Sequence, residues 1–185
     1  MDAINDGSLD LATCLAALPP EWPIDLQPVI DDHLIRHPQT VVVLDDDPTG
    51  TQTVAGIPVL TEWSVEALAN ELANNWPAIY ILTNSRSMPL AQAQALNSTI
   101  GHNLTIAAAQ AKRAISVVSR SDSTLRGHFP GEVAALAQGL GETNATWLII
   151  PFFLEGGRYT IDAVSYTHLR AHETKANLVC RLLLE

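Results

Sequence analysis

A run of four aliphatic residues that leads directly into three aspartates constrains the fold of this chain more than any other feature. Residues 41–44 read Val-Val-Val-Leu, and Asp45–Asp47 follow at once. A continuous apolar run of this length is typical of a strand buried on both faces, as in a parallel sheet. Pro48 and Gly50 then predict a tight turn, because proline presets φ and glycine permits positive φ. Adjacent carboxylates repel one another, so the cluster predicts either a site that holds a cation, a hydroxyl or an arginine, or a solvated acidic loop.

The composition is that of one globular domain in a reducing compartment. The chain has 185 residues, enough to bury a core, and 47% of them are hydrophobic while 16% are charged. The net charge of −10 argues against nucleic acid and anionic membrane surfaces as partners. Cys14 and Cys180 stand far apart, which predicts a cytoplasmic protein without a disulfide framework. No apolar run is long enough to span a bilayer, and the acidic N-terminus is unlike a signal peptide.

Apolar runs alternate with helical patterns along the chain. Extended segments are predicted at residues 41–44, 57–60, 78–82, 114–118 and 146–150. Helices are predicted around residues 9–18, 29–35, 65–72, 90–112 and 130–140, with Ser64 as an N-cap. Gly101, inside the longest helix, predicts either a kink or a close approach by a neighbouring element. The alternation predicts an α/β fold, a Rossmann-like three-layer domain with a mainly parallel sheet.

Four polar clusters each follow the carboxyl end of a predicted strand. They occupy residues 45–50, 84–87, 119–128 and 155–158. Ligands of open α/β sheets bind outside the carboxyl ends of the strands, so the clusters predict one shared crevice. Besides Asp46 and Asp47, the candidate site residues in these clusters are Thr49, Gly50, Ser85, Arg86, Arg120, Asp122, Ser123, Arg126, His128, Glu155 and Arg158.

The residue types in the clusters favour a small anion that carries hydroxyl groups, either a polyhydroxy acid or a phosphate. Four of the ten basic residues lie there, and arginine pairs bidentately with carboxylate or phosphate. For each arginine, the alternative is a salt bridge to one of the aspartates. The aspartates suit ligand hydroxyls, and one of them could act as a general base. His128 either contacts the ligand or caps its loop.

Two other kinds of site are not predicted. The chain has neither the glycine fingerprint of dinucleotide-binding folds after its first strand nor a P-loop motif. His33 and His37 lie one helical turn apart but have no third ligand near them, so no metal site is expected.

Three blocks of sequence together resemble the N-terminal domain of the four-carbon acid sugar kinases. They are Asp-Asp-Pro-Thr-Gly at residues 46–50, Ser-Arg-Ser-Asp-Ser-Thr-Leu-Arg-Gly-His at 119–128 and Pro-Phe-Phe-Leu-Glu-Gly-Gly-Arg-Tyr-Thr at 151–160. The resemblance covers about residues 40–162 and implies kinases of threonate, erythronate or 3-oxo-tetronate, in which a separate C-terminal domain binds ATP with Mg²⁺. It also implies a role for each of two groups of residues. Asp46 and Asp47 would lie at the reacting hydroxyl, and Arg86, Arg120, Asp122 and Arg126 around the sugar acid.

The chain departs from the family pattern in two places. Many members carry a further aspartate where this chain has Thr51-Gln52-Thr53. Residues 163–185 do not resemble the expected ATP domain and look like translated adapter DNA, an artefactual tail. If this tail is native, the pattern of Leu178, Leu182 and Leu183 predicts a short amphipathic helix.

The expected organisation is an N-terminal helical extension at residues 1–39, a sugar-acid-binding domain at 40–162 and a non-family tail at 163–185. The resemblance implies the substrate-binding half of an ATP-dependent sugar-acid kinase whose ATP domain is missing, so this chain is expected to hold no cofactor, to bind substrate weakly or not at all and to be inactive alone. A homodimer is a possible assembly. The alternatives are a stand-alone α/β module that binds a small anion without catalysis, and an acidic interaction domain that binds no small ligand.

Overall fold

The computed structural model describes residues 11–20, 23–122, 127–150, 158–161, 164–167 and 177–183. The chain divides into two compact units, Met1–His37 and Pro38–Glu185. The first unit contains the short helix α1 (Leu11–Ala16) and helix α2 (Gln27–Arg36), which confirms both helices predicted there. None of the helices within the described ranges is long and apolar enough to cross a membrane.

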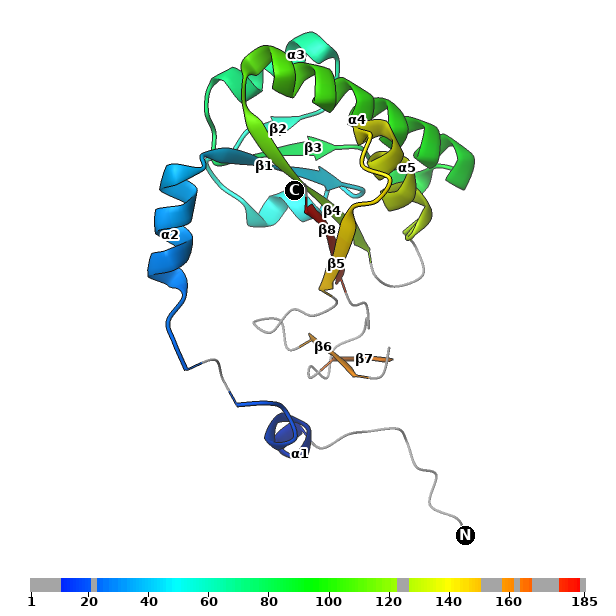
Figure 1. Ribbon diagram of the computed structural model, residues 1–185. Coiled ribbons are helices and arrows are strands. Elements are labelled where there is room, and N and C mark those ends of the chain that lie inside the picture. The colour runs from blue at the N-terminus through cyan, green and yellow to red at the C-terminus, as the bar shows by residue number, and fades with distance from the viewer. Residues whose placement is uncertain are drawn as a thin grey trace. The chain divides into compact units, whose positions relative to one another are not determined.

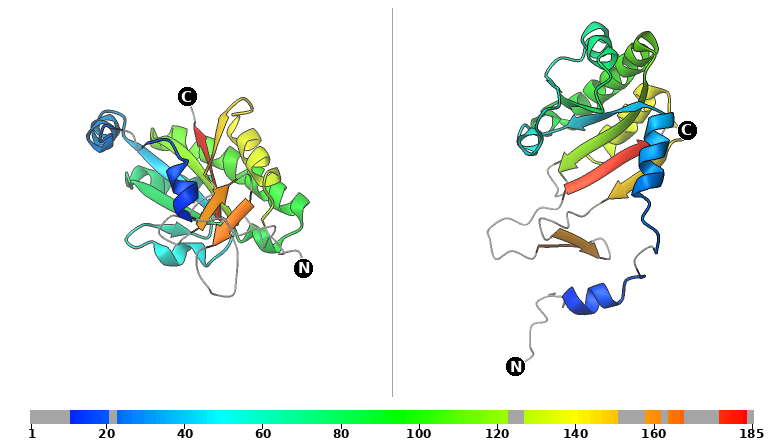
Figure 2. Two further views of the ribbon diagram at one scale, coloured as in Figure 1. Left: turned by 90° about the horizontal axis from the view of Figure 1, so that it is seen from below. Right: turned by 90° about the vertical axis from the view of Figure 1, so that its left-hand side faces the viewer.

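The second unit is built on a six-stranded sheet with the strand order β2-β3-β1-β4-β8-β5. Its strands are β1 (Gln39–Asp45), β2 (Val59–Leu60), β3 (Ala78–Leu82), β4 (Ala114–Asp122), β5 (Thr146–Ile150) and β8 (Asn177–Leu183). The four neighbouring strands β2, β3, β1 and β4 run parallel. β8 lies antiparallel between β4 and β5, as the right-hand view of Figure 2 shows. The predicted Rossmann-like α/β fold with a mainly parallel sheet is confirmed.

Three helices pack against the sheet and close the hydrophobic core. They are α3 (Val65–Ala73), α4 (Leu90–Ala111) and α5 (Gly131–Leu140). α4 lies between the other two and contacts both, above the sheet in the view of Figure 1. As predicted, the side chain of Ser64 caps α3 by accepting a hydrogen bond from the backbone N–H of Ala67. The largest fully buried core side chains are Val42, Leu68, Leu72, Ile79, Ile81, Ile100, Leu104, Val117, Val133 and Leu136.

β4 continues past the predicted end at Val118 and reaches Asp122. The prediction ended the strand where the residues become polar. In the structure, Ser119 pairs with Leu44 of β1, and Arg120 pairs with Asp45. The backbone of these polar residues is therefore paired with β1, and Arg120 belongs to a strand of the sheet and not to a loop.

The prediction of a helix in the C-terminal tail is wrong, because residues 177–183 form strand β8. β4 and β5 do not pair with each other, and β8 fills the position between them with a backbone ladder on each side. A helix of about this length is unstable alone, whereas a strand in this position gains partners on both edges. The structure also contains a separate two-stranded antiparallel sheet, β6 (Arg158–Ile161) with β7 (Val164–Thr167), which was not predicted.

Two glycines allow the backbones of α4 and α5 to come into direct contact. A Cβ atom added at Gly101 would lie 2.7 Å from the carbonyl oxygen of Leu136, and one added at Gly139 would lie 2.2 Å from that of Ser98. α4 runs without interruption from Leu90 to Ala111. Of the two possibilities for Gly101, the close approach is therefore the one that the structure contains.

We predict that Gly139→Ala destabilises the domain, although alanine normally favours a helix over glycine. The new methyl group meets the backbone of Ser98, which cannot rotate away, so the free energy of unfolding should fall by about 1–3 kcal/mol. Urea denaturation measures this change. Thr99→Ala, on the exposed side of α4, is the control and should not lower stability; a gain in stability for Gly139→Ala would contradict the close approach.

Candidate functional site

The carboxyl ends of three parallel strands meet at one edge of the sheet. Asp45, the last residue of β1, is in register with Leu82 of β3 and with Arg120 of β4. The segments that follow β1 and β3 therefore lie next to the end of β4. The structure brings together the clusters at residues 45–50, 84–87 and 119–122, which were predicted to converge.

Arg86 joins two of the aspartates. Its Nε and Nη2 atoms donate hydrogen bonds to Asp46 at 3.2 and 2.7 Å, and Nη1 donates to Asp47 at 2.5 Å. The side chain of Asp46 is 5% exposed, while those of Arg86 and Asp47 are 18% and 22% exposed. Asp46 also accepts a hydrogen bond from the hydroxyl of Ser121 at 3.3 Å. The arrangement fixes Asp46 in the interior and leaves Asp47 closer to solvent.

Arg120 forms a second ion pair on the adjacent strand. Its Nη1 atom donates to Asp45 Oδ2 at 2.9 Å, and the Asp45 side chain is 1% exposed. Burial raises the pKa of Asp45 above its ordinary value, although the guanidinium of Arg120 acts in the opposite direction. Arg86 and Arg120 thus both form the salt bridges that sequence analysis gave as the alternative to ligand binding. The side chain of Arg120 is still 26% exposed, so it is not fully enclosed by the protein.

Gly50 packs directly on the Asp45–Arg120 pair. A Cβ atom added to it would lie 1.5 Å from Arg120 Nη1 and 1.9 Å from Asp45 Oδ2. The prediction that Gly50 provides positive φ is wrong, because the residue begins the 3-10 helix η1 (Gly50–Thr53) and its φ is not positive. Glycine is required here because any side chain would displace the ion pair.

Thr49 and Ser85 organise the two loops that carry these charges. The backbone N–H and hydroxyl of Thr49 both donate to Asp47 Oδ1, at 2.8 and 2.7 Å. Ser85 begins the 3-10 helix η2 (Ser85–Ser87), and its hydroxyl contacts that of Thr83 at 3.0 Å. Thr49 therefore holds Asp47 in place, and Ser85 anchors the turn that carries Arg86.

The other predicted site residues fall in different places. His128 lies before α5, and its Nε2 atom hydrogen-bonds the carbonyl oxygen of Met88 at 2.8 Å, which ties its loop to the segment before α4. Asp122 is the last residue of β4, and Arg158 is the first residue of β6. Ser123, Arg126 and Glu155 lie outside the described residues.

Two buried polar residues beside the site were missed in the sequence. Glu132, in the first turn of α5, is 3% exposed, and Asn97, in the middle of α4, is also 3% exposed. Asn97 Nδ2 donates to Glu132 Oε1 at 3.1 Å. One signal for Asn97 was available, namely a polar residue on the apolar face of a helix. An acidic residue in the first turn of a helix is ordinary, so Glu132 carried no comparable signal.

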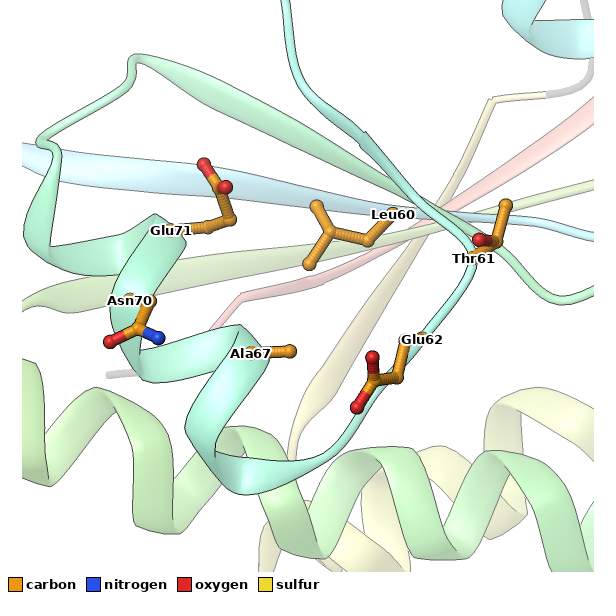
Figure 3. A pocket seen from close by; sticks show the side chains of 6 residues that line it. All are labelled: Leu60, Thr61, Glu62, Ala67, Asn70 and Glu71. Carbon is orange, nitrogen blue, oxygen red and sulfur yellow. The ribbon is translucent and has the colours of Figure 1, made fainter.

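A surface hollow of about 260 Å³ lies elsewhere in the domain. It is lined by Leu60, Thr61 and Glu62 after β2 and by Ala67, Asn70 and Glu71 of α3, as Figure 3 shows. No candidate site residue lines it, and it contains two carboxylates but no basic side chain. This hollow does not suit an anion, so it is not part of the candidate site.

The described residues do not provide a metal centre. No group of three or more histidine, cysteine, aspartate or glutamate residues within them is arranged to hold a metal ion. The aspartates at the carboxyl end of β1 instead form ion pairs with Arg86 and Arg120. The site can therefore offer guanidinium N–H donors to an anion and carboxylate oxygens to hydroxyl groups.

We predict that Arg86→Ala destabilises the domain strongly because it leaves the buried Asp46 without its charged partner. Removing one member of a buried pair is costly, and at this partly buried position the loss should be about 2–4 kcal/mol. Urea denaturation measures it. The matched control is Arg36→Ala, which breaks the exposed Arg36–Asp32 pair and should change stability by less than about 1 kcal/mol. Equal losses in the two variants would contradict a structural role for the Arg86 pairs.

Comparison with known proteins agrees with a site for a small polar ligand. A family model described as the sugar-binding N-terminal domain matches residues 41–177, which is more than half of the chain. The match begins within β1 and contains every predicted site residue. The search of curated proteins found no match. The chain therefore belongs to the sugar-binding N-terminal domain family, the domain of the four-carbon acid sugar kinases.

Proposed function

We propose that this chain binds a four-carbon sugar acid at the carboxyl ends of β1, β3 and β4, as the substrate-binding part of an ATP-dependent kinase. The observation that carries the proposal is the convergence of Asp46, Asp47, Arg86 and Arg120 at one sheet edge in a member of a sugar-binding family. Guanidinium groups suit the carboxylate of such a ligand, and carboxylates suit its hydroxyls.

Arg120 is the better candidate for the ligand carboxylate. Among the described interactions, it gives one N–H to Asp45, while its side chain remains 26% exposed. Arg86, in contrast, uses Nε and both Nη atoms on Asp46 and Asp47. An incoming carboxylate can therefore bind Arg120 without breaking the bonds that hold Arg86.

Asp47 is the better candidate for the reacting hydroxyl. It is more exposed than Asp46, and both its oxygens lie in a loop held by Thr49 and Arg86. In this proposal, Asp47 accepts the hydroxyl proton while Asp46 anchors Arg86. ATP with Mg²⁺ would supply the phosphoryl group from the separate domain that the family resemblance implies.

Ligand-induced stabilisation tests the proposal. Threonate or erythronate at high concentration should raise the melting temperature of the 185-residue chain, because a ligand that binds only the folded state stabilises it. Erythritol, which has the hydroxyls without the carboxylate, should give a much smaller shift. Arg120→Ala should abolish the sugar-acid shift, because the variant has lost the proposed carboxylate donor.

The matched control for Arg120→Ala is Arg113→Ala. Arg113 lies directly before the first residue of β4, at the end of the strand opposite to the site. It donates to Thr40 Oγ1 at 2.9 Å and to the carbonyl oxygen of Gln39 at 3.1 Å. This variant should lose stability but keep the sugar-acid shift. A shift with inorganic phosphate and none with sugar acids would instead support the anion-binding module, and no shift with any of these ligands would rule out the proposed site.

A further inference from the structure

Asp45 is a buried carboxylate to which the proposed function gives no role. Its side chain is 1% exposed, and each of its two oxygens accepts a hydrogen bond. Oδ1 accepts from the backbone N–H of Asp47 at 3.2 Å, and Oδ2 accepts from Arg120 Nη1 at 2.9 Å. One carboxylate therefore bonds both residues that the proposed function assigns to the ligand.

The backbone of Asp45 is itself fixed from both sides. Asp45 is the last residue of β1, in register with Leu82 of β3 and with Arg120 of β4. Its carbonyl oxygen accepts from the backbone N–H of Thr83 at 2.9 Å and from the Thr83 hydroxyl at 3.0 Å. Because the backbone that carries this carboxylate has little freedom, the carboxylate can hold other groups at defined positions.

Asp46 is not placed to replace Asp45 in this arrangement. Successive residues of a strand point to opposite faces of the sheet. Leu44 belongs to the core beneath the helices, so Asp45 points to the other face, together with Arg120, its partner in register. Asp46 accepts instead from Ser121, the residue after Arg120 on β4. The two adjacent aspartates therefore bond side chains on opposite faces of the sheet.

We propose that Asp45 is a positioning residue that fixes Asp47 relative to the guanidinium of Arg120. It thereby sets the spacing between the group that accepts the hydroxyl proton and the group that binds the ligand carboxylate. These two roles are those of the proposed function, on which this inference rests. Asp45 itself does not contact the ligand, because its side chain is buried and both of its oxygens already accept hydrogen bonds.

The alternative role for Asp45 is to neutralise Arg120 without positioning anything. The two roles predict opposite effects when the charge of Asp45 is removed. If Asp45 only neutralises Arg120, its removal leaves the guanidinium charge uncompensated and should strengthen the binding of an anion. If Asp45 positions Asp47 and Arg120, sugar-acid binding should be lost, although the net charge has become more favourable for an anion.

Asp45→Asn distinguishes these roles, because asparagine has nearly the shape of aspartate but only one oxygen that accepts. Its NH₂ group can only donate, so it faces either the N–H of Asp47 or the guanidinium of Arg120 with a second donor. One of the two bonds is lost in either orientation. The rise in melting temperature that threonate causes in the unchanged protein should therefore be lost in Asp45→Asn. An equal or larger rise in the variant would overturn the inference.

Two control variants separate positioning from the loss of charge or of stability. Asp32→Asn removes the same charge from an exposed side chain of α2 and should keep the threonate shift. Arg113→Ala should lower stability from the opposite end of β4 and should also keep the shift. Loss of the shift in Asp45→Asn but in neither control is the expected pattern. Loss in all three variants would contradict a specific role for Asp45.

Gly50→Ala tests the same ion pair without any change of charge. A Cβ atom at this position would lie 1.5 Å from Arg120 Nη1 and 1.9 Å from Asp45 Oδ2, so the methyl group displaces the pair. The threonate shift should be lost, as in Asp45→Asn. If Gly50→Ala keeps the shift, the pair does not position the ligand-binding groups, and the inference is wrong.

Hydrogen exchange in the unchanged protein tests the bond itself and needs neither a ligand nor a variant. The backbone N–H of Asp47 lies in the loop after β1, where it donates to Asp45 Oδ1. NMR should show that this amide exchanges with solvent more slowly than in an unfolded chain. Exchange at the unfolded rate would overturn the inference, whatever the variants do. A protein that protects this amide but shows no threonate shift would refute the proposed function and leave the link from Asp47 to Arg120 in place.

Discussion

The ion pairs between the aspartates after β1 and two arginines from neighbouring segments are the interaction on which the rest of the site depends. The Asp45 and Asp46 side chains are 1% and 5% exposed, and buried carboxylates are stable only with charged or hydrogen-bonding partners. Arg120 comes from β4, and Arg86 follows β3. The sheet brings these arginines to the aspartates by placing β1 between those two strands, so the site is a product of the strand order.

Because the strand order forms the site, its ion pairs also contribute to the stability of the domain. Arg86 holds Asp46, while Gly50 packs so closely on the Asp45–Arg120 pair that a side chain at this position would have to displace the pair. Buried, fully bonded charges of this kind rigidify a site because every alternative arrangement leaves a charge without a partner. Under the proposed function, the groups offered to a ligand are the two most exposed of these side chains, Asp47 and Arg120.

The sequence predicted the elements well because their signals are local. β3 and β5 have the predicted bounds, and Ser64 caps α3 as expected. Which aspartate binds which arginine could not be predicted, since Asp45 meets Arg120 only through the register of β1 with β4. The prediction of a helix in the C-terminal tail was wrong for a related reason. The spacing of Leu178, Leu182 and Leu183 fits a helix, and only the open position between β4 and β5 makes the segment a strand.

Under the proposed function, the charges of Asp45–Asp47, Arg86 and Arg120 favour one of the two ligand classes that the sequence left open. Asp45–Asp47 carry up to three negative charges, and Arg86 and Arg120 carry two positive ones. A phosphate dianion would add two further negative charges and brings few donors, whereas a sugar acid adds one and brings hydroxyls that can donate to the carboxylates. This balance supports the proposed sugar acid over a phosphate as the ligand. A phosphoryl group placed on the hydroxyl beside Asp47 would be repelled by the same carboxylates, which would favour release of the product over its retention.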